Sequence, residues 1–174
     1  MHLVGTWQVR SENLLENAAE EWSLIQKAAN ENYSPALYEI GPRAIRGEDP
    51  HCTPDKGWKM VRDAATLGSV QAQFYLGQAY ENGDGVPKEP DRARRYFRLC
   101  AARGQSRCEH SLAQLLLEGS PRSEDDYVQA IAWFQLAAEQ GDREAGVVVA
   151  QEQSNLTPAQ LALVKGWKSQ LLRK

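Results

Sequence analysis

A repeat of about 36 residues constrains this chain more than any other feature of its sequence. A pair of small residues recurs at 28–29, 64–65, 100–101 and 137–138, at intervals of 36, 36 and 37 residues. Three residues after each pair stand, in order, Asn32, Gly68, Gly104 and Gly141. A fixed period of this length is typical of stacked repeats, in which a single unit cannot bury its own apolar face.

Each repeat unit predicts an antiparallel pair of helices. Residues 71–80 carry apolar or small side chains at helical spacing, and Gly83 and Gly85 follow where the chain must reverse. The second helix is expected to begin at Pro90, which suits a first helical turn. We expect the corresponding starts at Thr53 in the preceding unit and Asp126 in the following one. The predicted fold class is all-α, a right-handed α-solenoid of antiparallel helix pairs with a C-terminal capping helix.

Both ends of the chain have the pattern of caps. We expect an N-terminal segment over residues 1–17, helical repeats over 18–150 and a C-terminal capping helix over 155–174. Thr157 and Gln160 flank Pro158 in the arrangement of a capping box. The stripe of Leu161, Val164, Trp167 and Leu171 is expected to pack as core and close the solenoid. The alternative is that this terminal helix holds a neighbouring chain.

Two units depart from the regular pattern. Pro42 falls inside the first helix of the first unit and removes a backbone donor, which predicts a kinked or shortened helix. The same unit has Asn32 in place of the terminal glycine, and its turn at 47–50 lacks the second glycine. The turn over 119–123 is one residue longer than its counterpart, so we expect it to be more mobile.

Charge and hydropathy exclude several classes of partner. With 20 Lys and Arg against 23 Asp and Glu, the net charge of −3 provides no basic excess for nucleic acid or an anionic membrane surface. The longest apolar run, residues 146–150, is far too short to span a bilayer. Residues 1–10 do not have the pattern of a secretory signal. We therefore expect a cytoplasmic protein or, if a signal has been removed, a periplasmic one.

The run from Phe74 to Lys88, followed by Ala93, Tyr96 and the small residues before Gly104, resembles the Sel-one-like (Sel1-like) repeat. This family is related to the tetratricopeptide repeat. The resemblance is strongest over residues 61–104, good over 124–145 and looser over 18–60. It implies a module that binds another protein, with no enzymatic activity of its own.

In repeats of this type the first helix of each pair lines a concave face, so the resemblance implies a partner-binding groove. The expected groove residues are Glu39, Arg46, Tyr75, Gln78, Asn82, Ser111, Gln114 and Glu118. Short proteins of this type also resemble immunity proteins encoded beside secreted effectors, including phospholipase effectors of type VI secretion. The expected partner is then a toxin encoded nearby. A plain solvated face and a cytosolic signalling adaptor are the alternatives.

Two cysteines occupy small-residue positions of successive units. Cys100 and Cys108 are separated by seven residues, and a cysteine-rich subgroup of the family uses this spacing for a disulfide. The resemblance thus implies a bridge and an oxidising compartment, with Cys52 as the odd thiol. The alternative is two buried free thiols that pack as small apolar groups. Members of the subgroup are proposed to bind or slowly hydrolyse β-lactams, which is the enzyme alternative, although no residue here is assignable as its nucleophile.

Metal, cofactor and catalytic motifs have little support. Two sets of side chains could be considered as metal ligands, Cys100, Cys108 and His110, or Asp49, His51 and Cys52. Neither has the paired spacing of a structural zinc site, and the turn at 82–85 lacks the ligands of a calcium loop. The sequence also lacks the nucleophile, zinc-protease and phosphate-binding motifs. We expect no metal, no cofactor and no enzymatic activity.

Overall fold

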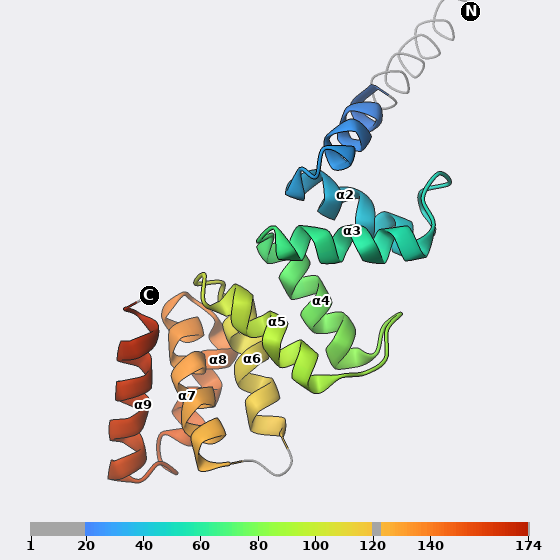
Figure 1. Cartoon of the computed structure of the whole chain (residues 1–174). Helices are drawn as coiled ribbons and strands as arrows, with labels where there is room; N and C mark the ends of the chain where they lie inside the picture. The colour runs from blue at the N-terminus through green and yellow to red at the C-terminus, as the bar shows by residue number, and fades with distance from the viewer. Residues whose placement is uncertain (1–19, 120–122, 174) are drawn as a thin grey trace, which may run out of the picture. The chain divides into compact units, whose positions relative to one another are not determined.

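A computed structural model describes residues 20–119 and 123–173 of the chain (Figure 1). In these residues every regular element is a helix, which confirms the all-α prediction. Contacts divide the chain into two compact units, with the boundary between Ala72 and Gln73. We refer to the described residues 20–72 as the N-terminal unit and to residues 73–173 as the C-terminal unit. The predicted segment 1–17 and the centre of the predicted turn 119–123 lie outside the described residues.

Helices follow one another through both units with short connections. Residues 20–30 are helical in the N-terminal unit. The next helices are α2 (Ser34–Ile45), α3 (Pro54–Thr66), α4 (Val70–Asn82), α5 (Pro90–Ala101), α6 (Ser106–Glu118), α7 (Glu124–Glu139), α8 (Arg143–Glu152) and α9 (Pro158–Leu171). α2 packs against α3, α7 packs against α6, α8 and α9, and α4 contains the boundary between the units. The run Val147–Val149 lies in α8, as predicted, and not in a strand.

The repeat period is visible in the backbone as a left-handed residue at the end of each turn. Asn32, Gly68, Gly104 and Gly141 have φ angles of 59°, 91°, 73° and 95°. At each of them the backbone N–H donates to the carbonyl of the residue three positions earlier, at 2.9 to 3.1 Å. Asparagine is one of the few residues that tolerate this conformation. The first unit therefore keeps the turn although it lacks the glycine.

Side-chain caps set two of the predicted helix starts. The Thr53 hydroxyl accepts from the Lys56 N–H at the start of α3, and Thr157 and Gln160 form the predicted capping box of α9. The prediction that α7 starts from Asp126 is wrong, because α7 begins at Glu124. The Ser123 hydroxyl accepts from the Asp126 N–H at 3.0 Å instead, and three acidic residues follow it at the positive end of the helix.

α2 continues through Pro42 for 12 residues, so the predicted shortening of this helix is wrong. The reason is close packing against α3. A Cβ built on Gly57 would lie 2.6 Å from the carbonyl oxygen of Gly41, which means that the two backbones are in contact. Pro42 is buried beside Gly41. Burial of this helix face outweighs the hydrogen bond that the proline removes, and the kink stays a prediction.

One core cluster of the C-terminal unit lies between α7 and α9. Val128, Ile131 and Val164 are almost fully buried in one cluster, with Leu161 and Trp167 packed against it. Leu161, Val164 and Trp167 of the stripe on the last helix thus contribute to the core, as predicted. The helix ends at Leu171, before the predicted end at residue 174.

Candidate functional site

The predicted groove residues are mostly on the surface, but they are divided between the two units. Glu39 and Arg46 belong to the N-terminal unit, and the other six belong to α4 and α6 in the C-terminal unit. Only Tyr75 and Ser111 are half-buried, and the remaining six are exposed. Six of the eight residues therefore belong to one unit, and a groove along the whole chain stays a prediction.

The part of this face in the C-terminal unit is acidic. Burial and the neighbouring Glu118 raise the pKa of Glu81, so these carboxylates of α4 and α6 lie close enough to repel each other. The Glu118 carboxylate accepts from the Gln114 amide at 2.9 Å, and Asn82 donates to Asp84 at 3.3 Å. The polar groups of this face mostly bond to one another.

A different surface of the C-terminal unit carries a concavity. A pocket of about 420 Å³ lies where the end of α5 and the start of α6 meet α7 and α9. We call it the C-terminal pocket. Its lining residues are Arg98, Ala101, Ala102, Gly104, Glu109, Gln129, Trp133, Leu136, Gln140, Trp167, Leu171 and Leu172. Its volume lies in the range of sites that enclose small ligands or side chains of a partner.

The walls of the C-terminal pocket are largely apolar. Trp133 and Leu136 contribute from α7, where both are buried, and Trp167 and Leu171 contribute from α9. Leu172 stands at the rim with 66% of its surface exposed. Tryptophan beside an exposed apolar side chain is typical of the residues that dominate binding energy at protein interfaces.

A buried carboxylate gives the pocket a polar side. Glu109 is only 2% exposed, and its two carboxylate oxygens accept from the Gln140 amide at 3.0 and 2.8 Å. Burial raises the pKa of Glu109, and the hydrogen bond from Gln140 opposes this effect. The pocket wall thus contains a strongly desolvated carboxylate.

A disulfide braces the wall that carries Glu109. Cys100 and Cys108 are joined at an S–S distance of 2.11 Å, with their Cα atoms 5.8 Å apart. The bond connects the last turn of α5 to the first turn of α6, and Ala101, Gly104 and Glu109 of the pocket wall lie in or beside this loop. Cys52 is a free thiol, and burial followed by the charge of Asp49 raises its pKa.

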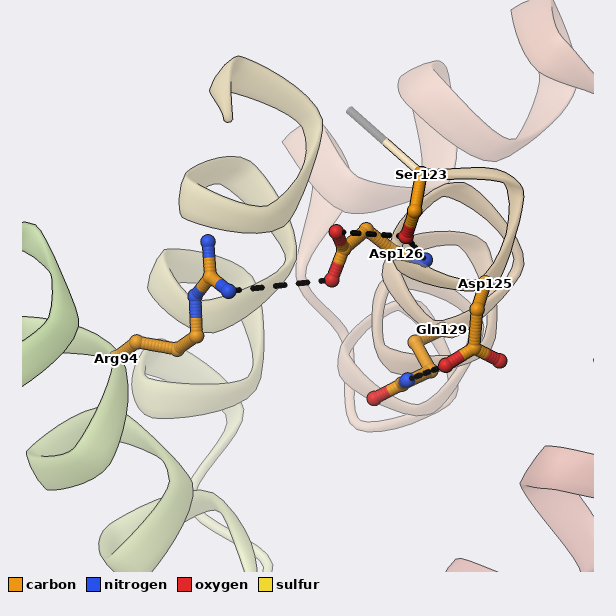
Figure 2. Close-up of polar contacts among 5 residues, drawn as sticks. All are labelled: Arg94, Ser123, Asp125, Asp126 and Gln129. Carbon is orange, nitrogen blue, oxygen red and sulfur yellow. Dashed lines mark hydrogen bonds and ion pairs between the residues drawn. The ribbon is translucent and has the colours of Figure 1, made fainter. Parts of the chain in front are cut away.

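Polar contacts also fix the start of α7 next to the pocket (Figure 2). Arg94 of α5 reaches across to Asp126, with 3.9 Å between Nη1 and Oδ1. One turn further on, the Gln129 amide donates to Asp125 at 2.6 Å. Gln129 lines the pocket, so these contacts hold one of its polar walls in place.

Glu109 was not predicted as a site residue from the sequence, although a signal for it exists. Glu109 follows Cys108 at the repeat position that Leu37 and Gln73 occupy in the two preceding units. A carboxylate at a buried, partly apolar position of a repeat indicates a local function. The sequence analysis also treated Trp167 and Leu171 only as core, whereas both line the pocket.

No group of three or more His, Cys, Asp and Glu side chains within residues 20–119 and 123–173 is arranged to hold a metal ion. Cys100 and Cys108 are bonded to each other and are not available as thiolate ligands. In the same residues, no helix has both the length and the hydropathy of a membrane span.

Comparisons with known proteins agree with the repeat. The Sel1 repeat model matches residues 70–105 and 106–142. A Sel1 repeat protein from Oxalobacter formigenes is 24% identical, with a TM-score of 0.68 over 75% of this chain and 98% of its own. A protective antigen of uropathogenic Escherichia coli with an SLR fold, c5321, is 21% identical, with a TM-score of 0.62 over 88% of this chain and 40% of its own. No curated protein matches the chain by sequence.

The two structural similarities show the fold, and the family model shows the repeat type over the middle of the chain. The fold is that of an all-α solenoid of helical repeats. Sel1 repeats serve as protein-interaction modules. Residues 70–142 of this chain are therefore similar to two consecutive Sel1 repeats, a kind of helical repeat that proteins use to bind other proteins.

Proposed function

We propose that this chain binds a partner protein, and that the C-terminal pocket receives an apolar side chain of that partner. The observation that supports this most strongly is the composition of the pocket, which combines Trp133, Trp167 and the exposed Leu172 with the buried Glu109. Apolar anchors surrounded by a few polar groups supply most of the binding energy at protein interfaces. The disulfide and the contacts of α7 hold this wall in place before binding, which lowers the entropy lost on association.

The predicted groove face offers weaker contacts. Several of its polar residues pair with neighbours, including Glu39 with Arg43 at 3.6 Å and Arg46 with Glu48 at 2.6 Å. Exposed ion pairs of this kind contribute little net energy, because water and salt screen them. We therefore propose that the groove residues affect specificity and association rate more than affinity.

The finer proposal concerns the partner and the compartment. We propose that the partner is a secreted effector, of the phospholipase type delivered by type VI secretion, and that the chain neutralises it in the periplasm. The size of the chain, its repeat type and the Cys100–Cys108 bond support this assignment, since disulfides persist in oxidising compartments. A cytosolic signalling adaptor is the alternative. Mass measurement of protein from the native host, without reductant and after thiol alkylation, separates the two through the number of alkylated cysteines.

The binding proposal is tested by titration calorimetry of the purified chain with the product of an adjacent effector gene. Leu172→Asp places a charge at the exposed rim without disturbing the core, and we expect it to weaken binding at least tenfold. Trp167→Ala is expected to have a similar effect. Gln114→Ala on the groove face is the matched control and should stay within about threefold of wild type. A large loss with Gln114→Ala and none with Leu172→Asp would move the interface to the groove.

The β-lactam alternative has its own test. Hydrolysis of nitrocefin by the purified chain at a rate above that of buffer would support an enzymatic role. The binding proposal expects no such turnover, and it expects Glu109→Gln to alter partner affinity and not a reaction rate.

A further inference from the structure

The C-terminal unit carries a basic surface that the net charge of the whole chain hides. Residues 88–107 contain seven Lys and Arg but only two Asp and Glu, a local charge of +5 in a chain whose net charge is −3. Six of the seven cations are exposed, and we call these six the basic surface: Lys88, Arg92, Arg95, Arg98, Arg103 and Arg107. A surface of this kind attracts an anionic partner.

The equivalent helix of the N-terminal unit pairs its charge internally. Lys59 of α3 donates to Asp63, four residues further on, at 2.9 Å. The same two repeat positions of α5 hold Arg95 and Leu99, and Leu99 is 45% exposed. Arg95 therefore lacks the carboxylate that its counterpart has.

Three arginines of the basic surface have no side-chain partner in the described part of the chain: Arg95, Arg98 and Arg107. Arg95 and Arg98 lie three residues apart on one helix, where like charges repel each other. Arg107 lies in the first turn of α6, at the positive end of the helix, where a cation is unfavourable. The stability of the fold does not account for these three charges, which favours a role in binding.

The basic surface is continuous with the C-terminal pocket. Arg98 belongs to the basic surface and also lines the pocket. Arg103 and Arg107 lie in the loop that the Cys100–Cys108 bond closes, and this loop contributes to the pocket wall. A partner that fills the pocket therefore meets arginine side chains at its edge.

We propose that the partner protein presents an acidic segment, whose apolar side chain enters the C-terminal pocket while its carboxylates bind Arg95, Arg98 and Arg107. This inference rests on the proposed function for the apolar side chain and adds the charge of the partner. Arginine suits the role, because its guanidinium binds a carboxylate through two parallel hydrogen bonds.

The surroundings of the basic surface favour an acidic protein segment over nucleic acid. A nucleic acid carries charge along its whole length. Three acidic residues form the first turn of α7, and one of them, Asp126, lies 3.9 Å from Arg94 of α5. A nucleic acid that extended past α5 would meet these carboxylates, whereas a short acidic segment would not.

The test is fluorescence anisotropy of the full chain with labelled peptides. The probe EELEE has one leucine between two pairs of glutamates, and its matched controls are QQLQQ, without the charges, and EEGEE, without the apolar side chain. We expect saturable binding of EELEE, about tenfold weaker binding of QQLQQ, and a loss of EELEE binding as salt is added.

Charge reversal then locates the site. R95E combined with R98E should weaken EELEE binding by about tenfold. The matched control is K59E combined with R62E, which alters the same two repeat positions of α3 and the net charge by the same amount, and it should stay within about twofold of wild type.

Arg107 separates binding from stability. R107Q removes a cation from the positive end of α6, so we expect EELEE binding several times weaker and a melting temperature that is unchanged or higher. This variant also provides the test if the double variant of α5 does not fold. A lower melting temperature with unchanged binding would contradict the proposal.

The outcomes distinguish this inference from the proposed function. Equal affinities for EELEE and QQLQQ, equal losses in the two double variants, or no saturable binding of EELEE would overturn the acidic partner. Tighter binding of a labelled oligothymidine than of EELEE would also overturn it and assign the basic surface to nucleic acid. Equal affinities for EELEE and EEGEE would instead overturn the apolar anchor, which the effector titration with Leu172→Asp tests separately.

Discussion

The two units have the same 36-residue register but differ at equivalent positions. The small residues Ala64 and Ala72 of the first correspond to the bonded Cys100 and Cys108 of the second. The turn residue Asp49 corresponds to Gly85, whose φ angle is 70°. Each unit has a cavity beside the positions at which its sequence differs from that of the other unit. The two units share the helix order and turns of the repeat. The candidate sites lie at the repeat positions where the residues of the two units differ.

The shared repeat structure depends on small residues and left-handed turn residues. Neither kind of residue has a side chain that could form a binding or catalytic site. In the C-terminal unit the exception is a covalent brace beside an apolar pocket. In the N-terminal unit it is an acidic side chain where a glycine could stand, beside a charged cavity. We therefore predict that substitutions at the shared repeat positions change stability. Substitutions at the positions where the units differ should change binding.

The largest effect on stability is expected when core residues at the same repeat position, but of different size, are replaced by alanine. Phe97 and Val61 occupy the same repeat position, and both are fully buried. Phe97→Ala should lower the free energy of unfolding by about 4 kcal/mol, because it removes a ring that also contacts Phe74. Val61→Ala should lower it by about 2 kcal/mol, since fewer buried carbon atoms are lost. Urea denaturation measures both, and equal losses would contradict the comparison.

The second-largest effect is expected from removal of the Cys100–Cys108 disulfide. Replacement of both Cys100 and Cys108 by alanine recreates the pair of the N-terminal unit and should lower the free energy of unfolding by about 2.5 kcal/mol. The loss comes mainly from the greater freedom of the unfolded chain. Cys52→Ala is the control and should change little. If dithiothreitol leaves the wild-type denaturation curve in place, the bridge does not contribute as proposed.

A smaller effect is expected where the first helix pair packs most closely. Gly57→Ala places a methyl group 2.6 Å from the Gly41 carbonyl oxygen and should lower the free energy of unfolding by about 2 kcal/mol. The equivalent residue of the other unit is Ala93, which is buried without difficulty. Gly166→Ala in α9 is the control, because nothing lies within 4 Å, and it should stabilise by up to about 1 kcal/mol. A neutral Gly57→Ala would show that α2 and α3 are farther apart than described.

The smallest effect is a pH dependence that belongs to the C-terminal pocket. Burial raises the pKa of Glu109, so the folded state holds this proton more tightly than the unfolded state. The contribution of Glu109 to stability therefore falls as pH rises from the ordinary glutamate pKa through the raised one. Glu109→Gln should remove this slope. Thermal melts of both proteins between pH 4 and 7 check it, and parallel curves would contradict the assignment.

Much of the fold could be predicted because local rules and the repeat agree. The period predicted the order of helices, and Thr53 and Thr157 predicted two helix starts. The start of α7 was missed because Ser123 precedes a run of acids, any of which could cap the helix. The length of α2 was missed because packing between Gly41 and Gly57 outweighs the local cost of Pro42.

The C-terminal pocket was less predictable, since it needs residues that are distant in the sequence. Glu109 meets Gln140 across 31 positions, and the pocket needs α9 to pack on α7. Periodicity assigns Trp167 to the core but does not indicate that part of it faces a cavity.

Hydrogen exchange of the chain with and without the proposed effector tests the role of the C-terminal pocket most directly. The account predicts new protection at residues 98–104, 129–140 and 167–172, which form the C-terminal pocket, and little change at 111–118 on the groove face. Protection confined to 75–82 and 111–118, with none around the pocket, would contradict it.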